Sequence, residues 1–149
     1  MKITNRKFHH NYQELEKYEA GVVLSGPEVK SIKLGSLKLD DAFVRIIGDE
    51  AFLINADIPI YLFTRPAGYD SRRTRKLLLH KKEILKMQIK LNAGGNLTVA
   101  PIAMYTKGRI LKLEIALAKG RRDVEKKKLV KQRDIALEQK REAREYMKK

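Results

Sequence analysis

The spacing of apolar and polar residues predicts β-strands that pair as hairpins. Residues 109–118 alternate, so that aliphatic side chains share one face and charged side chains share the other. The aliphatic face consists of Leu111, Leu113, Ile115 and Leu117. Residues 96–105 precede this strand across a turn at 106–108, which predicts an antiparallel hairpin. Residues 42–47 and 51–56 predict a second hairpin, because turn-forming residues separate them.

Residues 25–35 carry the signals of a short helix. Ser25 and Gly26 both suit the N-cap, and Pro27 is favoured at the first helical position. Val29 is predicted on the apolar face, and Gly35 suits the residue that ends a helix.

Residues 79–91 predict an amphipathic helix. Its buried stripe is expected to run through Ile84, Gln88 and Leu91, with Leu85 and Ile89 beside it. The opposite face is predicted to be lined by lysines at a spacing of four: Lys82, Lys86 and Lys90.

The remaining segments complete a small β-rich body. Residues 20–24 predict a short buried strand, whereas residues 1–18 show no clear period. Residues 57–72 contain two Pro and one Gly and predict a long surface loop, which in a small domain is usually functional or mobile. Together the segments predict a mainly β fold, a small oligonucleotide-binding-type β-barrel with two or three short flanking helices.

Positive charge is concentrated at the C-terminus. The 149 residues contain 33 Lys and Arg against 18 Asp and Glu, which gives a net charge of +15. Residues 1–118 hold 20 basic and 12 acidic side chains, and residues 119–149 hold 13 and 6. We therefore predict a body at 1–118 and a basic tail at 119–149. The tail has too few apolar residues to fold alone, so we expect disorder when it is free and a helix when it is bound.

Composition excludes several kinds of chemistry. The chain has no Cys and only three His, so thiolate metal sites and disulfides are excluded and an all-His metal site is not expected. No metal-ligand set and no nucleophile–base pair is visible, so we predict no cofactor, no metal and no enzyme. Residues 91–106, the longest uncharged stretch, contain two Gly and a Pro and predict no membrane span. Since no secretory signal is visible, we expect a cytoplasmic protein with a polyanionic partner, most often nucleic acid.

Four sequence blocks are more specific than the composition. In chain order they are Asn5-Arg6-Lys7; Tyr18-Glu19-Ala20-Gly21 leading to Glu28-Val29-Lys30-Ser31; Arg73-Thr74-Arg75-Lys76-Leu77-Leu78-Leu79; and Ala116-Leu117-Ala118-Lys119-Gly120. Their order and spacing closely resemble the SmpB family, the SsrA-binding proteins of bacteria, over almost the whole chain. No single block carries the resemblance, but the combination is specific.

The resemblance implies an adaptor in ribosome rescue. Proteins of this family bind transfer-messenger RNA and bring it to ribosomes stalled on messages that lack a stop codon. Their barrel grips the tRNA-like domain of that RNA near its elbow. Their basic tail is thought to enter the empty mRNA channel, where it becomes helical. The implied partners are therefore transfer-messenger RNA and the ribosome, near its decoding region, and we expect the free protein to be a monomer.

The resemblance also implies a set of RNA contacts. These are Asn5, Arg6, Lys7, Glu28, Lys30, Ser31, Arg73, Arg75, Lys76, Lys119 and Gly120. The arginines are the sharpest candidates, because guanidinium groups match phosphate oxygens and stack on bases. Glu28 is expected to accept hydrogen bonds from base amino groups or a 2′-hydroxyl, although simple helix electrostatics would also explain it. Phe8 and Tyr12 either stack on bases or cover the end of the barrel, and the sequence does not decide between these roles.

The tail departs from the family at one aromatic position. Members commonly carry an aromatic residue or His, followed by Asp-Lys-Arg, where this chain has Val124-Glu125-Lys126-Lys127. We therefore expect no stacking role for Val124. Ribosome contacts are expected from Arg121, Arg122, Lys126, Lys127, Lys128, Lys131 and Arg133.

Two other functions fit parts of the sequence. A ribosomal or general structural RNA-binding protein would share the basic composition, but it would not need the ordered set of motifs. A basic nuclease would need clustered carboxylates or His residues. The pair Asp40-Asp41 lies at a predicted strand end, where such residues are ordinary. We therefore favour the adaptor.

Overall fold

The computed structural model describes residues 1–61, 68–121 and 131–141. Within them the elements are β1 (Lys2–Thr4), α1 (Phe8–Asn11), β2 (Tyr12–Val22), α2 (Gly26–Lys33), β3 (Phe43–Ile47), β4 (Glu50–Ile54), β5 (Arg75–Leu78), α3 (Lys81–Asn92), β6 (Leu97–Lys107) and β7 (Ile110–Gly120). Residues 131–141 form a further helical segment, exposed along its whole length. None of the described helices is long and apolar enough to cross a membrane.

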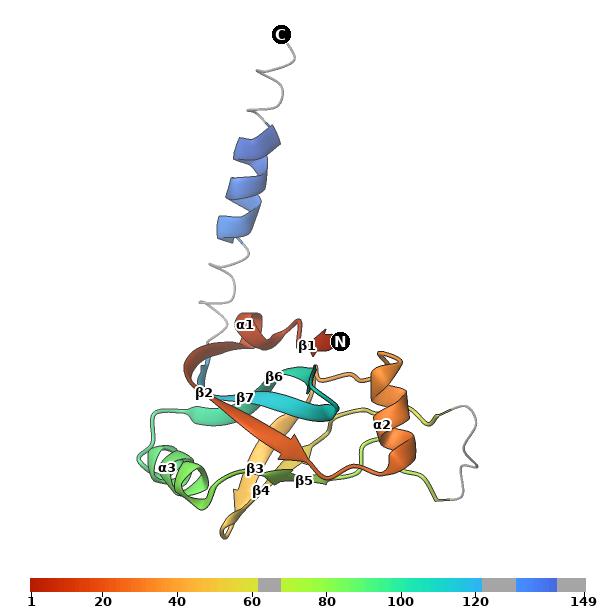
Figure 1. Ribbon diagram of the computed structural model, residues 1–149. Coiled ribbons are helices and arrows are strands. Elements are labelled where there is room, and N and C mark those ends of the chain that lie inside the picture. The colour runs from red at the N-terminus through yellow and green to blue at the C-terminus, as the bar shows by residue number, and fades with distance from the viewer. Residues whose placement is uncertain (62–67, 122–130, 142–149) are drawn as a thin grey trace.

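The antiparallel sheet closes on itself. Its order is β1-β6-β3-β4-β5-β2-β7, and β7 also pairs with β6, so every described strand except β1 belongs to a ring. β1 pairs with β6 from outside that ring. Closure removes the free edges that an open sheet would expose. The mainly β, barrel-type fold predicted from the sequence is confirmed, with α2 and α3 on opposite sides of the barrel (Figure 1).

β7 carries apolar residues on both faces. Leu113, Ile115 and Leu117 lie in the barrel interior, as the alternation predicts. On the outer face Ala116 and Ala118 are also fully buried, because Phe8 of α1 packs over them. Phe8 itself is 0% exposed. Of the two roles open to this ring, covering the barrel is therefore the one it performs.

Both predicted hairpins and the predicted helix α2 are confirmed, although the turn predicted at 106–108 lies at 108–109 because β6 extends to Lys107. Ile47 pairs with Glu50, and Lys107 pairs with Ile110, so each hairpin turns through two residues. Ser25 is the N-cap of α2. Gly35 follows the helix with φ +83°, a left-handed conformation that suits glycine.

The N-terminal 22 residues contain more regular structure than their pattern predicts. The predicted strand at 20–24 overlaps only the end of β2, which begins at Tyr12. The half-buried face of β2 includes Glu14 and Glu16, whereas Leu15 is 48% exposed. A bulge between Glu14 and Glu16 also interrupts the register. The alternation is therefore real, but polar residues on the inner face conceal it.

The helix predicted at 79–91 is confirmed as α3, but part of its predicted apolar face is wrong. Ile84 and Met87 are buried in α3, whereas Leu85 and Ile89 are 57% and 61% exposed. Successive residues are about 100° apart around a helix, so the buried arc is centred on Ile84, Met87 and Leu91. Leu85 and Ile89 lie well outside that arc.

Replacement of Phe8 tests the outer apolar layer. We expect Phe8→Ala to lower the free energy of unfolding by about 3–5 kcal/mol, because it empties a closed site over the barrel. Ile110→Ala is the control, since Ile110 is 61% exposed. Urea titration of both variants measures the difference. Equal stability of Phe8→Ala and the wild type would show that α1 does not pack on the barrel in solution.

Candidate nucleic-acid interface

Glu28, in the first turn of α2, is the centre of a buried polar network. Its backbone N–H donates to Ser25 Oγ at 3.4 Å, and the Ser25 N–H donates to Glu28 Oε1 at 2.9 Å. This capping box turns the carboxylate back toward the start of the helix. The residue is only 1% exposed.

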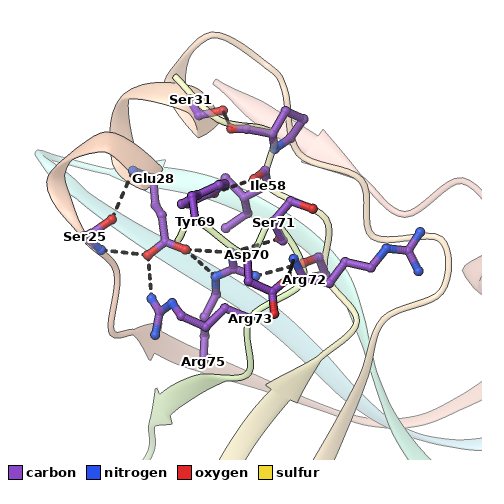
Figure 2. A network of polar contacts seen from close by, with 12 residues as sticks. Ser25, Glu28, Ser31, Ile58, Tyr69, Asp70, Ser71, Arg72, Arg73 and Arg75 are labelled. Atoms are coloured by element: carbon purple, nitrogen blue, oxygen red, sulfur yellow. Dashed lines mark hydrogen bonds and ion pairs between the residues drawn. The ribbon is translucent and has the colours of Figure 1, made fainter. Parts of the chain in front are cut away.

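Two arginines from the segment before and at the start of β5 bind this carboxylate (Figure 2). Arg73 Nη2 lies 2.5 Å from Oε1, and Arg75 Nε lies 2.7 Å from Oε2. Their environments differ sharply, because the side chain of Arg75 is 0% exposed and that of Arg73 is 46% exposed. Arg75 is therefore a structural cation, whereas Arg73 reaches the surface.

The remaining donors of Arg75 join distant parts of the chain. Nη1 donates to the Ala56 carbonyl at 2.9 Å, and Nη2 donates to the Ser71 carbonyl at 3.0 Å. One guanidinium thus connects α2, the chain after β4 and the segment that precedes β5. Among the described residues, no buried side-chain polar atom lacks a hydrogen-bond partner.

The described parts of the predicted loop at 57–72 are held in place. Ser31 Oγ donates to the Pro59 carbonyl at 2.7 Å, and the hydroxyl of Tyr69 donates to the Ile58 carbonyl. The Ile58 N–H donates to the Ser71 carbonyl at 2.9 Å, and Ile58 is 1% exposed. Residues 57–61 and 68–72 belong to no helix or strand element, so the loop prediction is confirmed for them. Buried Ile58 and these hydrogen bonds nevertheless fix both ends of the loop in place.

Opposing effects set the pKa of Glu28. Burial alone would raise it, but hydrogen bonds from the Ser25 amide and from Arg73 and Arg75 outweigh burial and hold the pKa below its ordinary value. The carboxylate is therefore ionised at neutral pH, and each bond to it is charge-assisted.

The residues predicted to contact RNA divide into two groups. Side chains on the surface are Arg6, Lys7, Lys30, Arg73, Lys76 and Lys119, and Gly120 is half-buried. Four others are buried: Asn5, Glu28, Ser31 and Arg75. These four bind neighbouring protein groups; Asn5 Nδ2, for example, donates to the Pro101 carbonyl at 2.9 Å. In this structure they are not open to a ligand.

A cleft that the sequence analysis missed lies between the barrel and the start of α3. Its volume is about 520 Å³, and its lining includes Glu19, Lys76, Leu78, His80 and Lys112. These residues come from β2, β5, β7 and the N-cap of α3, so only the fold brings them together. Glu19 and Leu78 do lie within the motif blocks of the sequence, which is the one signal that could have found them.

The cleft combines an apolar side chain with ordered charges. Leu78 is 56% exposed. Its position depends on Gly21 beside it, because a Cβ built on Gly21 would lie only 3.2 Å from the Leu78 Cβ and would push Leu78 aside. Glu19 accepts hydrogen bonds from the Tyr105 hydroxyl and from Lys107, and mainly the Tyr105 bond holds the pKa of Glu19 below its ordinary value. The cleft therefore offers an ionised acceptor beside an apolar surface and lysines.

The predicted tail contacts are only partly described. Arg122, Lys126, Lys127 and Lys128 lie outside the described residues, as does Val124. Lys131 and Arg133 lie exposed in the helical segment 131–141. Arg121 is half-buried at the end of β7. Within the described ranges, no group of three or more His, Cys, Asp or Glu residues could hold a metal ion.

Comparisons with known proteins give a consistent result. A family described as SmpB protein matches residues 2–145. An SsrA-binding protein of Persephonella marina is 49% identical over 135 residues, covering 91% of this chain and 88% of that protein. One from Coprothermobacter proteolyticus is 49% identical over 142 residues, covering 94% of each chain. A solved structure described as "tmRNA-SmpB: a journey to the center of the bacterial ribosome" matches with a TM-score of 0.68 and 37% identity, covering 82% of this chain and 85% of that one.

Replacement of Glu28 tests the buried network. We expect Glu28→Gln to lower the free energy of unfolding at pH 7 by about 3–5 kcal/mol, because it leaves Arg75 buried without its counter-charge. Because the folded-state pKa is lowered, the contribution of the carboxylate is fully present above the ordinary glutamate pKa of 4.5 and is lost as pH falls through and below it.

Urea titration from pH 7 to pH 3 should therefore show a weaker pH dependence for Glu28→Gln than for the wild type. Glu50→Gln is the control, since Glu50 forms an ion pair with Lys76 in which both side chains are nearly half exposed. That exposed pair should be worth at most about 1 kcal/mol. Equal costs for the two substitutions would contradict a buried ion pair in solution.

Proposed function

This chain belongs to the SmpB family, and we propose that it binds transfer-messenger RNA and delivers it to stalled ribosomes. The relatives are SsrA-binding proteins, and the matching solved structure concerns tmRNA and SmpB in the bacterial ribosome. The observation in this chain that best supports RNA binding is the cleft, which brings exposed Lys76 and half-buried Lys112 together with ionised Glu19 and exposed Leu78. Its rim also carries the acidic residues Asp49, Glu50 and Glu83. The barrel binds the tRNA-like domain, and the basic tail acts in the mRNA channel.

The cleft suits nucleotides with accessible base edges. Lys76 and Lys112 supply charge for phosphates, and Leu78 supplies an apolar surface for a base or sugar. Glu19 is placed to accept hydrogen bonds from base amino groups or a 2′-hydroxyl. In this proposal Glu19 has the specificity role that the sequence analysis gave to Glu28, because Glu19 is exposed and Glu28 is not.

A second RNA surface lies around the buried network. Arg72 and Arg73 are exposed beside it, and Lys30 is exposed on α2, where its Nζ lies 5.6 Å from the centre of the Tyr61 ring. Glu28, Ser31 and Arg75 act from below this surface by holding the segments that carry it. Asn5 does the same for the N-terminal arm, residues 5–12, which carries Arg6 and Lys7.

The proposed role is that of an adaptor, and we assign no catalytic step to it. The relatives are named for binding, which agrees with this assignment. A general RNA-binding protein is the competing function. Competition separates the two: unstructured RNA at equal concentration and moderate salt should not displace transfer-messenger RNA from this protein. Displacement would favour the general role.

Paired substitutions in the cleft test RNA binding. We expect Lys112→Ala to weaken the affinity for transfer-messenger RNA and to reduce the slope of log K against log salt by roughly 0.7–0.9, because one phosphate contact is lost. Leu78→Ala should weaken binding by about 1–2 kcal/mol, roughly 5- to 30-fold, with an unchanged slope. Filter binding at several salt concentrations measures both quantities.

Ile110→Ala provides the control, because Ile110 is as exposed as Leu78 but does not line the cleft. Its affinity and slope should equal those of the wild type. Wild-type binding by both Leu78→Ala and Lys112→Ala would remove the cleft from the interface.

Truncation tests the division of labour between body and tail. A chain ending at Arg121 keeps the whole barrel, so it should bind transfer-messenger RNA nearly as tightly as the full chain at moderate salt. It should nevertheless fail to support peptide tagging on stalled ribosomes, because the tail is missing. A truncated chain that tags normally would contradict the two-part proposal.

A further inference from the structure

Directly after the end of β7, Arg121 forms hydrogen bonds with the N-terminal arm. Gly120, the last residue of β7, pairs with Tyr12. The N–H of Arg121 then donates to the Asn11 carbonyl at 2.9 Å. Its side-chain Nε lies 2.9 Å from the His9 carbonyl and 3.3 Å from the Tyr12 carbonyl. Backbone and side chain of one residue therefore hold the C-terminal end of α1.

The chemistry of a helix end explains this contact. The last carbonyls of a helix have no partner within the helix, and α1 contains only Phe8–Asn11. A cationic donor at a helix C-terminus both satisfies these carbonyls and interacts favourably with the helix dipole. The Nε–H group of Arg121 takes this role.

The arm that receives Arg121 is itself fixed on the barrel. Phe8 is fully buried against β6 and β7. Asn5 donates from its backbone to the Ile102 carbonyl at 2.7 Å and from its side chain to the Pro101 carbonyl. On the other side, the Gly120 N–H donates to the Asn96 carbonyl at 3.4 Å. The backbone at the junction of body and tail is therefore held by two different segments.

We propose that Arg121 is a positioning residue that anchors the root of the basic tail to the N-terminal arm. This differs from the ribosome contact that the sequence analysis predicted for it, and it rests on the proposed function, in which barrel and tail act at different places. A fixed root raises the effective concentration of the tail at its own site once the barrel is bound. Loosening the root should therefore slow tagging without weakening the binding of transfer-messenger RNA.

Arg121→Lys separates anchoring from a phosphate contact. Lysine keeps the positive charge and still serves as a point charge for phosphate. It has no N–H at the Nε position, so it cannot reproduce the contact with the His9 and Tyr12 carbonyls. We expect Arg121→Lys and Arg121→Ala to lower the tagging rate by a similar factor, about tenfold, with an unchanged affinity for free transfer-messenger RNA. Lys140→Ala, in the exposed segment 131–141, is the control for loss of one tail charge.

Amide hydrogen exchange on the free protein gives a readout independent of the ribosome. The backbone N–H of residue 121, with its rate divided by the intrinsic rate for the residue present, should exchange faster in Arg121→Lys than in the wild type, because the side-chain contacts that hold its acceptor segment are lost. Phe8→Leu loosens α1 from the opposite side, so adding Arg121→Lys to it should slow tagging further by much less than tenfold.

Normal tagging by Arg121→Lys, or fully additive effects with Phe8→Leu, would contradict the anchoring role. Such a result would favour the contact between the Arg121 charge and the ribosome that the sequence predicts. Unchanged exchange at residue 121 would contradict the anchoring role equally. Failure of the wild type to bind transfer-messenger RNA or to tag would instead contradict the proposed function, while the exchange result on the free protein would still decide whether the anchor exists.

Discussion

The ion pair between Glu28 and Arg75 is the constraint on which the RNA-facing surface depends. Both side chains are almost completely buried, and removing two charges from water costs several kcal/mol for each ion. That cost is offset only while every donor and acceptor is satisfied, which here requires Ser25, Ala56 and Ser71 to stay in place. The pair therefore adds little to net stability. Its main effect is to fix one arrangement of α2, β5 and the segment between β4 and β5.

That arrangement determines what β5 presents to solvent. Residues in a strand alternate between its two faces, so burial of Arg75 also places Leu77 inside and turns Lys76 and Leu78 outward. A shift of one residue would bury Lys76 and withdraw Leu78 from the cleft. The buried ion pair and the exposed cleft thus belong to one strand register, although Glu28 does not line the cleft.

The sequence predicts those parts of the fold that depend on local signals. The two hairpins and the helix capped by Ser25 follow from alternation, turn residues and capping preferences within short windows. Sequence could not separate Arg73 from Arg75, because the two are chemically identical and two positions apart. Only the placement of α2 buries one and exposes the other. The same limit explains the missed cleft, whose residues come from four elements and meet only after the barrel closes.

The basic side chains that form ion pairs in the described residues differ in whether RNA can bind them. Lys76 pairs with Glu50, and Lys107 pairs with Glu19, in contacts that are largely exposed and therefore worth little to the folded state. A phosphate can replace either carboxylate at small cost, and this opens Glu19 Oε1 to a base while Tyr105 still holds Oε2. Arg75 cannot make that exchange, because leaving Glu28 unpaired would cost far more than one phosphate contact returns. RNA affinity should therefore come from the exposed lysines and arginines, while the buried pair keeps them in register.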